Sequence, residues 1–107
     1  MSSTWKAKSA HLVLLALKDS PKHGYEITKY VKNRSNGFFS IGYSSLYPTM
    51  HSLEKAGFIA GEWQAIGAKE KKVYKITKKG LRELKSISSE YFGFIEAFNL
   101  MLGTDHV

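Results

Sequence analysis

The stretch YSSLYPTMHSLEKA, residues 43–56, decides the fold because it reads as a helix with two unlike faces. At 100° per residue, the apolar Leu46, Met50 and Leu53 fall within about 40° of one another. The opposite side carries small or hydrogen-bonding side chains, which are Ser44, Pro48, His51 and Lys55, flanked by Ser45 and Ser52. One face therefore suits a protein core, and the other suits contact with a polar partner.

Both ends of this helix carry recognisable signals. Proline lacks a backbone N–H, and a helix tolerates it without loss only in the first turn. Pro48 therefore predicts a helix start at Ser44 or Ser45, and either serine is a suitable N-cap. Gly57 follows the last helical residues and predicts the stop.

Two further helices are predicted before this stretch. The run Leu12 to Leu17 is apolar nearly all round, which indicates a central buried helix from about Trp5 to Asp19. Pro21 ends it, because the residue before a proline is pushed out of the α region. A second helix is predicted for residues 23–34, and the pair Asn36-Gly37 then indicates a turn.

After the third helix, the pattern changes to a hairpin and one long helix. Residues 58–66 and 72–77 are predicted strands, and residues 67–71 join them as a basic tip. Thr77 is the expected N-cap of a final helix that runs from about Lys78 to Leu102. The expected fold is mainly α with a small β-hairpin, in the order of a winged helix-turn-helix. Its units are a winged-helix domain (residues 5–77) and a C-terminal helix (residues 78–103).

The charge pattern favours a polyanionic partner. The chain has 107 residues and a formal net charge of +7. Between Lys69 and Lys85 there are eight Lys or Arg residues against two Glu, whereas residues 86–107 contain no Lys or Arg. Such an excess also occurs on ordinary solvated surfaces. Nucleic acid is the leading functional interpretation, because each neutralised phosphate releases counterions.

The final helix carries an apolar heptad that predicts a homodimer. Apolar residues recur there at alternating spacings of three and four, namely Leu84, Ile87, Tyr91, Phe94, Phe98 and Met101. A chain of this size has little core left to cover so much aromatic surface. Pairing with the same helix of a second copy would cover it and would match a palindromic DNA site. The alternative is that the helix folds back on its own first helix.

Four motifs resemble the PadR family of bacterial regulators. They are HGYEI at residues 23–27, SLYP at 45–48, LEKAGFI at 53–59 and YKITKKG at 74–80, and the resemblance extends over about residues 11–80. It implies a winged-helix domain, a C-terminal dimerisation helix and repression of transcription. The tail of a single helix is similar to the compact branch that includes multidrug-responsive repressors.

The wing departs from the family pattern. PadR-like wings often carry a Gly-Gly-Arg-x-Arg type of tip, whereas residues 67–72 here are GAKEKK, without arginine and with one acid. Narrow minor grooves attract arginine in particular, so minor-groove reading by wing arginines does not carry over from the family to this tip. Contact between its lysines and phosphates is not affected.

The third helix and the wing supply the residues that we expect to contact double-stranded DNA. They are Tyr43, Ser44, Ser45, Tyr47, Thr49, His51 and Lys55 on the helix, with Lys69, Lys71 and Lys72 on the wing. Serine and threonine bond either bases or phosphates, so they contribute little specificity alone. The alternative for Tyr47 is packing against the second helix, and for the lysines it is a solubilising role.

The aromatic residues of the apolar heptad on the last helix also suggest an effector site. In the compact PadR branch, planar hydrophobic drugs lie between aromatic side chains at the dimer centre. Counting from residues 77–80, Tyr91 stands at the position that resembles the stacking aromatic. Phe94, Phe98 and Trp5 would line the same space. The alternative is that these aromatics only pack the interface.

Other classes of protein find little support. We expect no enzyme and no cofactor, because the chain has no nucleophile-elbow motif, no phosphate-binding glycine loop and no paired acids. His51 has no second ligand at metal-binding spacing, and the chain has no Cys, which fits a reducing cytoplasm. No apolar run is long enough to span a membrane. The remaining alternative is a winged-helix module that binds RNA or protein.

Overall fold

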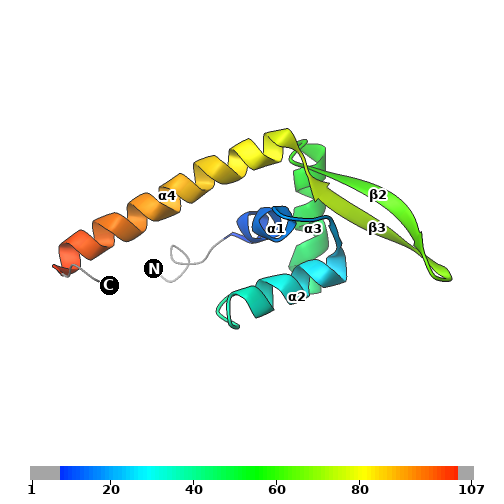
Figure 1. Cartoon of the computed structure of the whole chain (residues 1–107), viewed down its shortest axis with the longest axis horizontal. Coiled ribbons are helices and arrows are strands. Elements are labelled where there is room, and N and C mark those ends of the chain that lie inside the picture. Colours follow the sequence, from blue (N-terminus) through cyan, green and yellow to red (C-terminus); the bar gives the residue numbers. More distant parts are fainter. Residues whose placement is uncertain (1–7, 104–107) are drawn as a thin grey trace.

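A computed structural model describes residues 8–103, which form four helices and one small sheet (Figure 1). Trp5, named above as an effector residue, lies outside the described residues. The elements in chain order are α1 (Ser9–Leu17), β1 (Lys22–His23), α2 (Gly24–Arg34), α3 (Tyr43–Lys55), β2 (Ile59–Ile66), β3 (Lys69–Ile76) and α4 (Lys78–Leu102). The arrangement confirms the predicted winged helix-turn-helix with a long C-terminal helix.

The core forms where α1 meets the other helices and the base of the sheet. All but one of the residues from Leu12 to Leu17 are buried, as the apolar run predicted, and Leu15 is the exception. The apolar face of α3 (Leu46, Met50 and Leu53) and Ile27 of α2 pack in the same cluster. Burial of each such side chain contributes about 1.5–3 kcal/mol to the stability of the fold. Because only the apolar face of α3 enters this cluster, the core holds the helix by that one face.

The start of α3 differs from the prediction. The helix begins at Tyr43 with Gly42 as its N-cap, and the Gly42 carbonyl accepts hydrogen bonds from the backbone N–H groups of Ser45 and Leu46. Pro48 therefore lies inside the helix rather than in its first turn, and neither Ser44 nor Ser45 is the cap. The proline is tolerated because it lies on the exposed side, where water can hydrate the carbonyl it leaves unpaired.

The hairpin is longer and its turn is tighter than predicted. Ile66 pairs directly with Lys69, so Gly67 and Ala68 alone form the turn. Gly67 has φ +66°, which the first position of a type II′ turn requires. Residues 69–71 therefore belong to β3 rather than to a loop. The sheet also gains a strand that no local pattern indicated, because Lys22 and His23 pair with β3 in the order β1-β3-β2.

The two halves of α4 have different surroundings. Leu84 and Ile87 are 5% and 8% exposed and belong to the core of the protomer. The sequence named both for a dimer interface, whereas within the protomer they are already covered, because the first turns of α4 pack on α1. Beyond them the helix leaves the body (Figure 1), and the large apolar side chains of its second half are exposed. The core thus crosses the expected domain boundary at residue 77.

Candidate nucleic-acid interface

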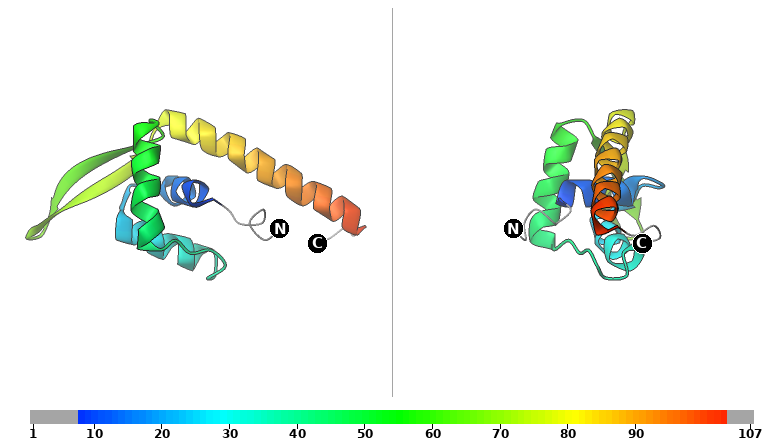
Figure 2. Two further views of the ribbon diagram at one scale, coloured as in Figure 1. Left: turned by 180° about the vertical axis from the view of Figure 1, so that it is seen from behind. Right: turned by 90° about the vertical axis from the view of Figure 1, so that its left-hand side faces the viewer.

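The outward face of α3 is polar and accessible along its length. Ser44, Ser45, His51 and Lys55 are exposed, and Thr49 is half-buried. Seen from behind, α3 lies between the hairpin and α4 (Figure 2), so the hairpin flanks this helix as a wing. Tyr43, Ser44, Tyr47, His51 and Lys55 lie on one side of α3, and Ser45 and Thr49 lie on the flank beyond them. We call this polar part of the helix the reading face (residues 43–45, 47, 49, 51 and 55).

Tyr47 combines the two roles that the sequence left open. Its side chain is 52% exposed, yet it also packs on α2. A Cβ added at Gly24 would lie only 2.8 Å from the Tyr47 hydroxyl oxygen, so glycine allows this close approach. The ring of Tyr43 stacks on that of Tyr47 at 6.3 Å. The two tyrosines therefore form a supported edge of the reading face, with their outer surfaces open to a partner.

The wing is attached to α3 by a carboxylate. Glu54 accepts a hydrogen bond from the Gly61 backbone N–H at 3.2 Å and from the Lys72 ammonium at 3.1 Å. It therefore holds both strands of the wing against the reading helix. The hydrogen bond to Glu54 is the main reason why the pKa of Lys72 is raised. Sequence analysis missed Glu54, because its partners lie seven and eighteen residues away on another element.

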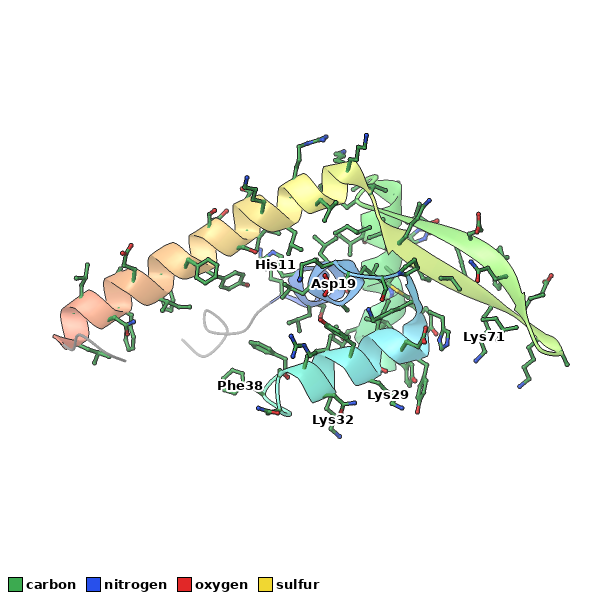
Figure 3. The ribbon with its side chains drawn as sticks, in the orientation of Figure 1. His11, Asp19, Lys29, Lys32, Phe38 and Lys71 are labelled. Carbon is green, nitrogen blue, oxygen red and sulfur yellow. The ribbon has the colours of Figure 1, made fainter. Side chains whose placement is uncertain are left out.

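The three lysines predicted at the wing tip do not form one patch. Side chains alternate across a strand, so Lys69 and Lys71 lie on one face of the hairpin and Lys72 lies on the other. Lys69 and Lys71 are exposed, and Lys71 projects from the wing (Figure 3). Lys72 is half-buried and paired with Glu54. Lys69 and Lys71 are therefore better placed than Lys72 to meet a phosphate.

A groove lies between the wing, α3 and the start of α2. It encloses about 540 Å³, and its lining includes Tyr25, Tyr47, Trp63, Lys71 and Tyr74. Trp63 is 65% exposed and stands directly opposite Lys72 in the hairpin register. Sequence analysis did not single out Trp63; the signal that was available was an unexplained tryptophan in a strand whose other residues are mostly small or polar.

A second groove lies between α1 and α4. Its volume is about 270 Å³, and its walls are almost entirely apolar, with Leu15, Phe39, Phe92 and Ile95 among them. Tyr91 also lines it and shares a hydrogen bond of 2.8 Å with the Nδ1 atom of His11. Figure 3 places His11 beneath α4. Burial, followed by the nearby Lys8, lowers the pKa of His11 below its ordinary value of 6.5.

Residues 13–86 match the family model described as "Transcriptional regulator PadR-like family", which covers more than half of the chain. The chain belongs to the PadR-like family of transcriptional regulators. This membership confirms the resemblance seen in the four motifs and places the chain among regulators of transcription rather than enzymes.

One relative from this family matches more than two thirds of this chain. The negative transcriptional regulator PadR of Bacillus subtilis (strain 168) is 36% identical over 75 residues, which are 69% of this chain and 41% of that protein. The chain therefore spans less than half the length of this relative. The residues that match the family model, 13–86, include the four PadR-like motifs.

Solved structures of PadR-like proteins share the fold. Bacillus subtilis PadR in complex with operator DNA is 35% identical, with a TM-score of 0.67 over 72% of this chain and 44% of that chain. A PadR family transcriptional regulator from Eggerthella lenta DSM 2243 is 31% identical, with a TM-score of 0.74 over 90% of this chain and 82% of that chain. The second of these matches most of α4 as well as the winged helix.

Residues 8–103 support neither a metal site nor a membrane-spanning helix. These residues contain no cluster of three or more potential metal ligands, and His51 stands alone on the reading face. None of their helices combines the length and the hydropathy that a membrane-spanning segment requires. Within the described chain, the reading face with its wing and the apolar surface of α4 are the features that call for a function.

Proposed function

We propose that this PadR-like regulator binds double-stranded DNA sequence-specifically, with the reading face of α3 in the major groove and the wing on the adjacent backbone. The observation that supports it is the two-faced α3, whose core side is buried and whose outer side presents hydroxyls, His51 and Lys55. Such side chains bond base edges and phosphates. The solved complex of Bacillus subtilis PadR with operator DNA supports the same assignment.

The wing supplies phosphate contacts in this proposal. Lys69 and Lys71 carry exposed ammonium groups, and we assign them to the backbone of the DNA. Lys72 was predicted to share this role. Its ammonium is paired with Glu54, so we assign Lys72 to holding the wing in place instead.

The second half of α4 pairs two subunits in this proposal. Tyr91, Ile95 and Leu102 continue the face of Leu84 toward the end of α4, and all three are exposed. Phe94, Phe98 and Met101 broaden this surface. An exposed apolar stripe of this length exceeds what a monomer tolerates, and the same helix of a second copy complements it. A two-fold dimer then reads an inverted repeat.

We further propose that the regulator is a repressor released by a small hydrophobic molecule at the dimer interface, and that it acts in the cytoplasm. The apolar groove beside Tyr91 supports a ligand of this class, because few of its walls are polar. Phe94, Phe98 and Trp5 were named with Tyr91 for this site. Phe94 stacks on Phe98 at 6.2 Å, and neither ring is among the residues that line the groove within the protomer.

Selection from random DNA tests the main proposal. Purified protein is used to enrich duplexes from a random-sequence pool, and the affinity for the enriched duplex is then measured over a range of salt concentrations. We expect an inverted repeat with half-sites about 34–36 Å apart. We also expect a log–log salt slope of roughly −0.9 for each phosphate contact.

Two controls separate this function from its alternatives. A Ser44→Ala, His51→Ala double variant keeps the buried face of α3 and should lose discrimination between enriched and random DNA. Single-stranded RNA of matched length should bind weakly, because the described reading face offers few aromatic platforms. Equal binding of RNA, or no enrichment of any DNA sequence, would contradict the proposal.

A further inference from the structure

The end of α3 leaves three successive carbonyl groups outside the helix. Gly57, with φ +85°, ends the helix: its N–H donates to the Glu54 carbonyl, and the Phe58 N–H donates to the Leu53 carbonyl. These two bonds make a Schellman motif. The carbonyls of Ala56, Gly57 and Phe58 come after those that it uses, so they need partners from elsewhere.

The start of α4 supplies all three partners. The Lys79 ammonium donates to the Ala56 carbonyl at 2.7 Å, and the Thr77 hydroxyl donates to the Gly57 carbonyl at 2.7 Å. The Thr77 backbone N–H donates to the Phe58 carbonyl at 3.1 Å. The same Thr77 hydroxyl accepts a hydrogen bond from the Gly80 N–H at 3.0 Å, which caps α4. One hydroxyl therefore joins the end of the reading helix to the beginning of α4.

Close packing reinforces these bonds. Gly80 is buried, and a Cβ at this position would collide with the Phe58 carbonyl oxygen and press on Ile76. The ammonium of Lys79 lies 5.0 Å from the centre of the Phe58 ring. We call this arrangement the α3–α4 joint (Phe58, Thr77, Lys79 and Gly80, with the carbonyls of Ala56 and Gly57). Figure 1 shows the two helix ends meeting there.

We propose that the α3–α4 joint fixes the angle between the reading helix and the dimerisation helix, and so sets the half-site spacing that the dimer accepts. Thr77 and Lys79 are positioning residues in this scheme and touch no DNA. The inference rests on the DNA binding and the dimerisation proposed above. It adds a determinant of specificity that lies outside the reading face.

The geometry of α4 makes the angle at the joint consequential. A helix of 25 residues is about 37 Å long, so a rotation of about 10° at one end moves the other end by roughly 6 Å. This displacement is nearly two base-pair steps of about 3.4 Å. Leu84 and Ile87 also hold α4 against the core, but apolar packing is non-directional. The hydrogen bonds of Thr77 and Lys79 are directional and can define the angle.

Distance measurements between the two reading helices test the inference without DNA. The chain has no Cys, so Ser52→Cys on the exposed side of α3 provides one site for a nitroxide label. Double electron–electron resonance then reports the separation of the two labels in the dimer. Lys79→Met and Thr77→Val each remove donors from the joint. Lys78→Met removes the same charge from the exposed neighbour, and Thr77→Ser keeps both hydroxyl bonds.

We expect Lys79→Met and Thr77→Val to broaden or shift the distance distribution, and the two control variants to leave it unchanged. On the duplex enriched by the unaltered protein, we expect discrimination against a spacer changed by one base pair to fall about tenfold in both joint variants. Thermal unfolding shows whether each variant is folded. If Thr77→Val is not folded, the comparison of Lys79→Met with Lys78→Met tests the inference. Unchanged distances and unchanged discrimination would overturn the inference.

Failure of the proposed function would look different. If the labelled parent protein shows no distance between labels, there is no dimer, and the inference falls with the dimerisation. If the parent dimerises but enriches no DNA, the DNA-binding proposal fails while the distance test of the joint still stands. A joint that only stabilises the fold would lower the unfolding temperature in both joint variants and leave the spacing preference intact.

Discussion

At the scale of single residues, the structure separates side chains that look equivalent in the sequence. Lys71 and Lys72 are neighbours in a basic run, yet one is exposed and the other is paired with Glu54 on α3. An ion pair that water still reaches, as here with both side chains about a third exposed, contributes little to stability. The Glu54–Lys72 pair instead orients the wing, because the same carboxylate also accepts a hydrogen bond from the Gly61 backbone N–H.

Lys71→Ala and Lys72→Ala should therefore have different effects on DNA binding. Lys71→Ala should reduce the log–log salt slope by about one unit and weaken binding to all sequences alike, because one phosphate contact is lost. Lys72→Ala should change the slope less, because its ammonium is engaged within the protein. Fluorescence anisotropy over a salt series measures both. Lys85→Ala, an exposed lysine on α4, is the control, and equal slopes for Lys71→Ala and this control would remove Lys71 from the contacts.

His11 should make the stability of the protein depend on pH. Burial and Lys8 hold the pKa of its imidazole below the ordinary value of 6.5, while Glu83 and Glu90 act in the opposite direction. Below pH 6.5 the unfolded chain therefore binds more protons at this residue than the folded chain does. The free energy of unfolding should be highest above pH 6.5 and should fall as the pH drops through the pKa of the folded state.

Thermal unfolding between about pH 7.5 and pH 5.5, a range that brackets the ordinary pKa of histidine, checks this prediction. The His11→Gln variant should lose less stability than the unaltered protein over this range, because its side chain does not titrate. His51→Gln, on the exposed reading face, provides a matched control for the loss of one histidine. If His11→Gln and the unaltered protein show the same pH profile, burial of His11 has no part in the acid response.

At the scale of elements, α4 is one continuous helix with two environments. Its first turns belong to the core and to the α3–α4 joint, and its second half lies outside the body of the protomer. The apolar face runs along both halves without a break, since Leu84 and Ile95 share one face. The same sequence pattern therefore serves the interior of one subunit and, in our proposal, the contact between two.

Ile95→Glu and Leu84→Ala should separate these two roles. Ile95 is 51% exposed, so Ile95→Glu should leave the fold of the subunit intact and dissociate the dimer, since a charge would be buried at the seam. Leu84→Ala should instead lower the free energy of unfolding by about 2–5 kcal/mol, because it opens a cavity in the core. Sedimentation equilibrium and urea unfolding distinguish the outcomes. A dimer that persists in Ile95→Glu would argue against the proposed interface.

Two glycines of α4 should respond in opposite ways to alanine. Gly80→Ala should lower the free energy of unfolding by about 1–3 kcal/mol, because its Cβ meets the Phe58 carbonyl in a packed site. Gly93→Ala should raise it by about 0.5–1 kcal/mol, because nothing lies near the added methyl group and alanine favours the helix. Urea unfolding measures both. A neutral Gly80→Ala would show that the joint adjusts without cost.

At the scale of the whole molecule, the wing and α4 extend in opposite directions from the core. The described chain measures 57 × 27 × 25 Å, and the long dimension runs from the tip of the wing to the end of α4 (Figure 1). In our proposal, DNA contact and subunit contact therefore occupy opposite ends of the protomer. A signal from a ligand at α4 has to cross the core or the α3–α4 joint to reach the reading face.

Single-tryptophan variants should report on the two ends separately. The chain has two tryptophans, Trp5 and Trp63. In Trp5→Phe, the emission comes from Trp63 beside the groove of the wing, and binding of the enriched duplex should quench it. In Trp63→Phe, cationic aromatic dyes should quench the remaining Trp5 if Trp5 lines the proposed effector site. Quenching of Trp63 by dyes, or the absence of quenching across a broad dye panel, would contradict an effector site at the dimer interface.

Local periodicity in the sequence determines much of this fold. The apolar run of α1, the two faces of α3, the glycine stop at Gly57 and the Thr77 cap depend on residues that are close in sequence, and each is confirmed. The motifs of residues 23–80 also suffice to indicate the family. These features are predictable because helix period, capping and turn chemistry act within a few residues.

Only the tertiary structure decided which residues meet across the chain. The two-residue strand β1 exists because β3, some fifty residues later, offers it a partner. Glu54 pairs with Lys72, which the sequence groups with the exposed wing lysines. Leu84 and Ile87, which the sequence assigns to a dimer interface, pack in the core of the protomer. The α3–α4 joint likewise needs two helix ends to meet. These outcomes depend on how whole elements dock, and no local pattern of residue types encodes that geometry.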